Sequence, residues 1–208
     1  MRRRQYVWLS VVLALLVLWY VPGISMASGP EQPSQIVQRL ISVIGSLKAR
    51  NSDQSLVHEP ADEVATATTA IAMLDIVGIS QEALGKHWET CNSKEKQEFL
   101  ALFKNLIGKI AFLQIGHVFR SLNISIAEQR VSGHQAVVST AVRHPKEGAI
   151  SIDYLMTRNG QTWQVHDVAL DGVSVGTSLR GQFHKILTQH SFTELLQLMQ
   201  AKLSGANK

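Results

Sequence analysis

Few residues stand in a pattern that could support catalysis, and the clearest is a G-x-S-x-G segment at residues 172–176. In α/β hydrolases such a segment exposes a nucleophilic serine on a sharp strand-to-helix turn, and Ser174 would be that serine. Those enzymes need an acid and then a histidine after it. Glu194 is the only acid after Ser174, and no histidine follows it. A turn with glycines and a locally bonded hydroxyl fits the sequence better.

The histidines and the single cysteine do not form a metal-binding pattern. The eight histidines are scattered, without an H-E-x-x-H segment or paired Cys and His at zinc spacing. His87 and Cys91 are i, i+4 neighbours, but two ligands make a poor site. Asp167 is expected to cap the following turn or to pair with Arg180. We therefore expect no metal, no cofactor and no catalytic residue.

The composition predicts one domain. The chain has 208 residues, 45% hydrophobic and 17% charged, which excludes collagen, long coiled coils and general disorder. The formal net charge is +4, but Arg2, Arg3 and Arg4 contribute three of the 20 basic residues. Without residues 1–27, 17 basic residues stand against 16 acidic ones, a net charge of +1. A nucleic-acid-binding surface is therefore not expected.

Residues 1–27 have the three parts of a secretory signal peptide. The arginines precede an apolar run at residues 7–21, and Ser25-Met26-Ala27 offers small residues for cleavage after Ala27. We expect export to the periplasm and one mature domain at residues 28–208, without an internal disulfide. An uncleaved anchor is the alternative, although the run is near the short end of what spans a ~30 Å hydrocarbon core.

Apolar periodicity predicts an α+β domain. Helical spacing is found at residues 34–47, 61–76, 80–88 and 93–115. Period-two patterns then predict four strands, at residues 122–127, 135–142, 149–157 and 161–170. We expect these strands to form an antiparallel meander packed against N-terminal and C-terminal helices.

Local signals mark several boundaries. Asn159-Gly160 is a strong hairpin signal, because both residues tolerate positive φ. Asn92 and Ser93 are N-cap candidates for the long helix. Thr177 or Ser178 is expected to cap the next-to-last helix, and Ser191 to Glu194 is a capping box for the last one.

The helix predicted at residues 93–115 is apolar well beyond one stripe. One face carries Phe99, Phe103, Leu106, Ile110 and Leu113, and further apolar residues widen it: Leu100, Leu102, Ile107, Phe112 and Ile115. A helix of this kind must be covered on several sides. It is either a central core helix or a helix that packs on the sheet and also lines a cavity.

Two stretches carry a family resemblance. Residues 84–88 read LGKHW and are followed by SKEKQEF at 93–99; residues 163–168 read WQVHDV and precede Gly172, Ser174, Arg180 and Phe183. On these residues the chain resembles the toluene-tolerance or MlaC family of periplasmic phospholipid-binding proteins, over about residues 36–203. Gly176 departs from the pattern, since relatives usually carry a bulky aliphatic residue there.

The resemblance implies a cystatin-like fold with a four-stranded curved sheet, with phospholipid as the ligand. It also implies a monomeric carrier that shuttles lipid between an inner-membrane ABC and MCE-type complex and an outer-membrane lipoprotein complex. Outer-membrane lipid asymmetry would depend on that traffic.

A lipid carrier needs a dry aliphatic lining with few hydrogen-bonding groups, because an unpaired polar group there costs about 1–3 kcal/mol. We expect an apolar cavity between helices and strands. The residues expected to contact acyl chains are Phe103, Leu106, Ile107, Ile110, Ile152, Tyr154, Val165, Val173 and Phe183.

Two other functions stay open at this point. One is a serine esterase that uses Ser174. The other is a membrane-anchored interaction module of the same fold without a ligand.

Overall fold

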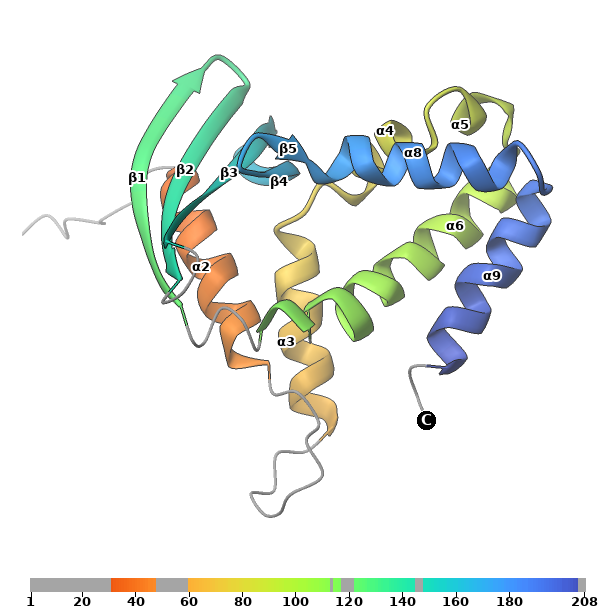
Figure 1. Ribbon diagram of the computed structural model, residues 1–208, viewed down its shortest axis with the longest axis horizontal. Coiled ribbons are helices and arrows are strands. Elements are labelled where there is room, and N and C mark those ends of the chain that lie inside the picture. The colour runs from red at the N-terminus through yellow and green to blue at the C-terminus, as the bar shows by residue number, and fades with distance from the viewer. Residues whose placement is uncertain (1–30, 48–59, 113, 117–121, 145–147, 206–208) are drawn as a thin grey trace, which may run out of the picture.

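A five-stranded antiparallel sheet and a set of helices make up the computed structural model (Figure 1). The structure describes residues 31–47, 60–112, 114–116, 122–144 and 148–205. The predicted signal peptide, including the expected cleavage site, lies outside the described residues.

The sheet is a simple meander in the order β1-β2-β3-β4-β5. Its strands are β1 (Asn123–Ser132), β2 (Gln135–His144), β3 (Gly148–Asn159), β4 (Thr162–Leu170) and β5 (Val173–Ser174). The four predicted strands are confirmed, but a fifth was missed. β5 has two residues, which is too short for an alternating pattern to reveal. The cystatin-like arrangement that the resemblance implies stays a prediction.

Tight turns and bulges shape the sheet. Gly133 and Gly160 have φ angles of 58° and 61° in the turns between β1 and β2 and between β3 and β4, which confirms the Asn159-Gly160 hairpin. The register shifts between Ile126 and Glu128 and between Leu155 and Met156. Bulges of this kind bend a strand and increase its twist.

Helix α2 (Pro33–Ser46) packs against the sheet (Figure 1). Its buried stripe includes Ile36, Val37, Leu40 and Ile44, spaced as one helical face requires. The sequence therefore predicted both the helix and the face that it buries.

Helix α3 (Pro60–Ala72) ends earlier than the predicted residue 76. After it the chain runs beside β4: the Asp75 N–H donates to the Val165 carbonyl (2.9 Å), and the Val165 N–H donates to the Met73 carbonyl (2.8 Å). Asp75 then caps α4, because its carboxylate accepts the Gly78 N–H at 2.9 Å. The extended stretch from Met73 to Asp75 therefore separates two helices.

The single helix predicted at residues 80–88 is wrong. The structure has α4 (Ile76–Leu84) and α5 (Lys86–Thr90), separated by Gly85 with φ 53° and ψ −130°. This positive-φ conformation ends one helix and redirects the chain into the next, and it favours glycine.

Helix α6 (Ser93–Leu106) begins with a capping box between Asn92 and Glu95 and continues into the π-helical segment η1 (Ile107–Ala111). The sequence predicted an uninterrupted α-helix here. A Cβ atom on Gly108 would lie 3.0 Å from Ile71 Cδ1 of α3, so the glycine permits close packing of η1 on α3. π segments inside α-helices occur frequently at functional sites.

Among the described residues, one helix of 24 residues, Ser93–Gly116, is long and apolar enough to cross a membrane by length and composition alone. Within the domain it packs against α3 and α9. In its most apolar stretch, 35% is buried, and Ile115 is the large apolar residue there that is 40% exposed.

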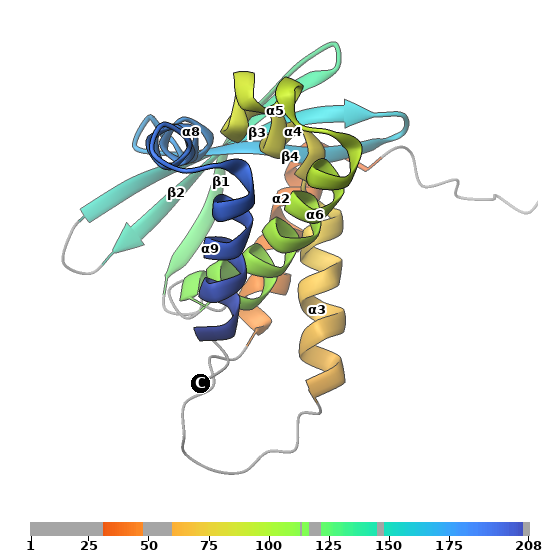
Figure 2. The same ribbon diagram turned by 90° about the vertical axis from the view of Figure 1, so that its right-hand side faces the viewer.

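The chain ends with α8 (Val175–Leu187) and α9 (Phe192–Gly205). Figure 2 shows α9 beside α6, and Figure 1 shows α9 at the end of the molecule away from β1. The Ser191 N–H donates to Glu194 Oε2 at 2.7 Å, and the Glu194 N–H donates to Ser191 Oγ at 3.3 Å, which confirms the predicted capping box. Thr177 and Ser178 do not cap α8; Ser174 does.

Candidate functional site

The apolar interior divides into two clusters. The first, which we name the sheet cluster, combines α2, the end of α3 and the covered face of β2, β3 and β4. It includes Val138, Ile152, Tyr154, Met156 and Val165, all 6% exposed or less.

The second, which we name the helical cluster, is formed by α4, α6, α8 and α9. Its centre is aromatic: the Phe99 ring stacks on Phe103 at 5.5 Å between centroids and meets Phe183 edge-on at 5.6 Å. Such geometries add about 0.5–1.5 kcal/mol per pair to the gain from burial.

Three partly buried residues, Ile71, Leu74 and Ile107, pack against both clusters. We name this set the seam. Ile71 belongs to α3 and Ile107 begins η1, so the seam lies where α3 and the π-helical segment meet. The two halves of the interior are therefore continuous through a few aliphatic side chains.

Eight of the nine predicted acyl contacts belong to these clusters. Ile152, Tyr154 and Val165 belong to the sheet cluster, Phe103, Leu106, Ile110 and Phe183 to the helical cluster, and Ile107 to the seam. Val173 is separate from them, because its side chain is 65% exposed on β5. The structure brings the eight into one continuous apolar interior and leaves Val173 at the surface.

The apolar arc of α6 and η1 is covered unevenly. Phe99 is fully buried, whereas Leu106, Ile107 and Ile110 are only partly buried and Ile115 is 40% exposed. The predicted excess of apolar surface is thus present. The cover of this helix is therefore complete near Phe99 in α6 and incomplete from Leu106 into η1.

Tyr154 carries the one polar atom of the predicted set. Its side chain is 3% exposed, and its hydroxyl has no hydrogen-bond partner among the described residues. Burial raises the pKa of this phenol well above its ordinary value, so it stays neutral. A buried unpaired hydroxyl is costly, and a ligand that supplied an acceptor would remove that cost.

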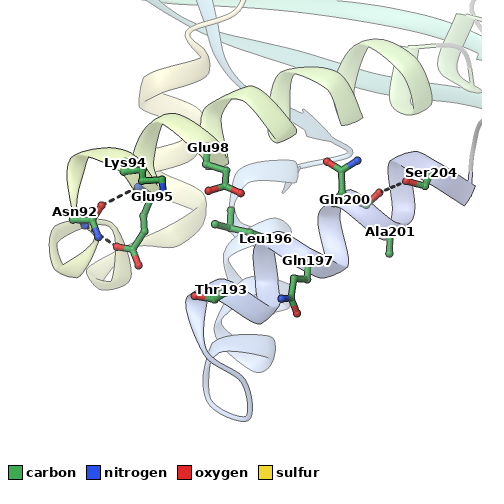
Figure 3. A pocket seen from close by; sticks show the side chains of 10 residues that line it. All are labelled: Asn92, Lys94, Glu95, Glu98, Thr193, Leu196, Gln197, Gln200, Ala201 and Ser204. Atoms are coloured by element: carbon green, nitrogen blue, oxygen red, sulfur yellow. Dashed lines mark hydrogen bonds between the residues drawn. The ribbon is translucent and has the colours of Figure 1, made fainter.

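Two surface pockets lie on the helical layer rather than among the predicted contacts. One, of about 690 Å³, lies between α6 and α9, and most of its lining residues are polar, among them Glu95, Glu98 and Gln197 (Figure 3). The other, of about 520 Å³, lies between Lys86 of α5 and Arg180 of α8. Neither includes a predicted acyl contact, so neither is the apolar cavity that the sequence led us to expect.

The G-x-S-x-G segment forms a capped turn. Ser174 Oγ donates to Asp167 Oδ2 at 2.5 Å and accepts the Thr177 N–H at 2.9 Å. Asp167 Oδ1 accepts the N–H groups of Gly176 and Val168, each at 2.8 Å. The interpretation of Ser174 as a locally bonded hydroxyl and of Asp167 as a turn cap is confirmed.

Gly176 has a steric reason to depart from the family pattern. A Cβ atom there would lie 3.2 Å from Asp167 Oδ1, which is tight for a larger side chain. In this chain the carboxylate that holds the turn takes that space.

His166 links the two halves of the fold, and the sequence analysis missed it. Its Nδ1 lies 3.1 Å from Asp75 Oδ2, and its Nε2 lies 3.3 Å from Glu82 Oε2. These contacts join β4 to the cap and body of α4. Asp75 is 91 residues away in the chain, so no local spacing could have indicated the cluster.

Metal-ligand chemistry finds no support in the described part of the chain, where no group of three or more His, Cys, Asp or Glu could hold an ion. Cys91 is buried, and its Sγ donates to the His87 carbonyl at 3.1 Å. Burial, and secondarily Glu95, raises the pKa of this thiol, which keeps it protonated and unreactive.

The described residues combine an antiparallel meander, a helical cover and a continuous aliphatic interior. The sequence model of the family described as MlaC protein matches residues 34–201, and the chain belongs to that family. It is therefore a phospholipid-binding carrier rather than an enzyme.

A solved structure shares the fold. The phospholipid-binding protein from Ralstonia solanacearum, solved in complex with a phospholipid, has a TM-score of 0.66 and 18% sequence identity. The match covers 84% of this chain and 96% of that one. A search of curated proteins finds no match.

Proposed function

We propose that this protein carries phospholipid across the periplasm with its acyl chains held at the seam between the sheet cluster and the helical cluster. In the proposal, it receives and delivers lipid at an inner-membrane ABC and MCE-type complex and an outer-membrane lipoprotein complex. Residues 1–27 direct its export and are then removed. The family membership supports this proposal, as does the phospholipid bound to the Ralstonia solanacearum protein.

The observation that carries the proposal is the incomplete cover of α6 and η1 beside the seam. Leu106, Ile107 and Ile110 are partly buried next to a fully buried aromatic centre. Aliphatic side chains at such a position gain free energy when acyl chains cover them, at roughly 25 cal/mol per Å² of apolar surface.

The energetics of transfer favour a protein of this kind. A lipid with two 16-carbon tails exposes about 30 methylenes, which at ~0.8 kcal/mol each exceeds 20 kcal/mol in water. A carrier does not have to bind tails better than a bilayer does. It needs a dry lining of comparable chemistry, and aliphatic side chains supply one.

Acyl chains enter, in this proposal, by parting the two clusters at Ile71, Leu74 and Ile107. Each cluster has its own buried centre, so separation at the seam leaves both centres intact. The Tyr154 hydroxyl then has an acceptor available in a lipid ester carbonyl. Val173, at the surface of β5, is not part of this site.

Native mass spectrometry of the purified mature protein, followed by organic extraction, tests the function. We expect close to one phospholipid per protein. The variant Ile107→Ser should lower the loaded fraction severalfold, and the matched control Val173→Ser should not, since Val173 lies outside both clusters. Circular dichroism checks that both variants fold.

An empty protein that takes up no added phospholipid would contradict the proposal. Combined with an N-terminus retained after export, that result would favour an anchored interaction module. Equal loading of the two serine variants would place the acyl chains elsewhere than at the seam.

A further inference from the structure

His166 is placed by an irregularity in the pairing of β3 with β4. Leu155 and Met156 are consecutive on β3, and their partners on β4 are Asp167 and Val165. His166 is therefore an extra residue of β4 without a partner on β3, which makes it the bulged residue. Bulges re-aim side chains, and the ring of His166 contacts α4.

Two carboxylates of α4 lie at the two nitrogens of this ring. Nδ1 is 3.1 Å from Asp75 Oδ2, and Nε2 is 3.3 Å from Glu82 Oε2. The three side chains are 24% to 35% exposed, so water and salt screen them less than a fully exposed pair. We name His166, Asp75 and Glu82 the histidine bridge.

The backbone of α4 leaves room for the bridge. Asp75 Oδ1 accepts the Gly78 N–H at 2.9 Å, which leaves Oδ2 free to face His166. A Cβ atom on Gly78 would overlap Asp75 Oδ2 and lie 2.7 Å from His166 Nδ1. A side chain at residue 78 would therefore displace the ring from Asp75.

No other cation pairs with these carboxylates in the part of the chain that the structure describes. Asp75 and Glu82 form ion pairs with His166 alone. From α8, Arg180 lies over the C-terminal end of α4 and forms no ion pair. Asp167, next to His166 on β4, bonds to Ser174 Oγ and to backbone N–H groups. The β3 residues beside the bulge are apolar.

The geometry of the bridge matches a protonated ring. A neutral imidazole has one N–H, so it donates to one carboxylate and turns a bare nitrogen towards the other. An imidazolium ion donates to both, through charge-assisted hydrogen bonds. Histidine is the side chain whose charge ordinarily changes around neutral pH, so the number of closed contacts depends on pH.

The bridge joins the two halves of the interior. His166 follows Val165 of the sheet cluster, whereas α4 contributes Ile76 and Leu84 to the helical cluster. Leu74 of the seam directly precedes Asp75. Parting the clusters at the seam therefore loads the contacts between β4 and α4.

We propose that His166 is a positioning residue whose proton sets how readily the two clusters part, so that phospholipid exchanges more slowly when the ring is protonated. The inference rests on the proposed function, because it takes the seam as the entry of the acyl chains. The step is a reversible proton transfer from water to the ring. With a neutral ring one of the two contacts is lost, and α4 separates from β4 more readily.

Transfer of pyrene-labelled phosphatidylcholine from the loaded mature protein to phosphatidylcholine vesicles tests the inference. Both lipids are zwitterionic, so the vesicle charge stays constant between about pH 5.5 and about pH 8, a range in which histidine titrates and ordinary carboxyl groups do not. We expect transfer to be about fivefold or more slower at the lower pH, as for one charge-assisted hydrogen bond that is partly exposed to water.

Two variants and a control separate the proton from a merely structural role. His166→Gln should transfer at one rate at both pH values. Glu82→Gln should be slow at both, because its amide donates to Nε2 while the neutral ring donates from Nδ1 to Asp75. His190→Gln is the matched control: His190 pairs with Glu194 alone, at 3.6 Å, and its loss should leave the pH dependence intact. Circular dichroism at both pH values checks folding.

Urea unfolding of the lipid-free protein measures the bridge without the ligand. The folded state favours the protonated ring, so this stabilisation is present at the lower pH and is lost as pH rises. The unaltered protein should therefore lose more unfolding free energy between the two pH values than His166→Gln does.

The outcomes separate this inference from the proposed function. A pH dependence of transfer that persists in His166→Gln, or fast transfer by Glu82→Gln at both pH values, would overturn the inference. So would a loaded protein whose transfer rate does not change with pH, and that result would leave the proposed function standing. A protein that takes up no labelled lipid would contradict the proposed function and this inference with it.

Discussion

The sheet cluster and the helical cluster both bury apolar side chains, but different interactions hold them in place. The sheet cluster is held by the backbone hydrogen bonds that pair β2 with β3 and β3 with β4. These bonds fix the positions of side chains such as Val138 and Val165. The helical cluster depends on side-chain packing around Phe99. We therefore expect the sheet to be the more rigid wall and the helical layer to be the part that adapts to a ligand.

The largest expected effect comes from the aromatic centre of the helical cluster. Phe99→Ala should destabilise the protein by about 3–5 kcal/mol, because it removes a fully buried ring that contacts other aromatic rings. Urea unfolding measures the change. Leu198→Ala on α9, where the side chain is 49% exposed, is the control and should cost well below about 1 kcal/mol.

The second largest loss of stability is expected at Asp167, which holds the turn between β4 and α8. Asp167→Ala should cost about 2–3 kcal/mol, because it removes the acceptor of Ser174 Oγ and of two backbone N–H groups. The same unfolding measurement checks it. Ser174→Ala removes one of those bonds and the α8 cap, so a larger loss than for Asp167→Ala would contradict this ordering.

Tyr154 distinguishes the empty site from the loaded one. In lipid-free protein Tyr154→Phe should be neutral or stabilising by up to about 1–3 kcal/mol, because it removes a buried unpaired hydroxyl. In lipid-loaded protein the same change should be destabilising, since the hydroxyl has gained an acceptor. Thermal unfolding of both forms measures the difference, and the same sign in both would count against a lipid carbonyl at Tyr154.

The smallest expected effect is on the pH dependence of stability, through Glu194 in the first turn of α9. Bonds from the Ser191 N–H and hydroxyl hold the pKa of Glu194 below its ordinary value. The ionised form is favoured in the folded state, so this stabilisation is present above the ordinary pKa and is lost as pH falls through the lower folded value. Glu194→Gln should flatten the acid side of the curve of unfolding free energy against pH. An unchanged slope would show that the cap contributes nothing there.

Local chemistry explains what could be predicted from the sequence. The Ser191 to Glu194 box, the Asn159-Gly160 turn and the apolar alternation of the strands each act over a few residues, and each was found where expected. The nine proposed contacts were chosen from apolar patterns, which indicate burial but not which cluster a residue joins. Val173 is nevertheless exposed, since it begins the two-residue edge strand β5 directly after the turn at Asp171 and Gly172.

Long-range contacts explain the rest. Gly108 of the π segment lies against Ile71 of α3, and the stretch that follows α3 pairs with Val165 of β4. The pocket between Lys86 and Arg180 needs α5 and α8, which are some 90 residues apart in the chain. No spacing within a short window records such neighbours.

The position of the acyl chains is measured most directly by methyl NMR of the mature protein loaded with a phospholipid that carries a nitroxide near the end of one tail. The account predicts that the methyl signals of Ile71 and Ile107 at the seam are broadened beyond detection. The methyl signals of Val131 on β1 and Val173, which are 51% and 65% exposed, should persist. Sharp signals at the seam together with broadened signals at the surface valines would contradict the central claim.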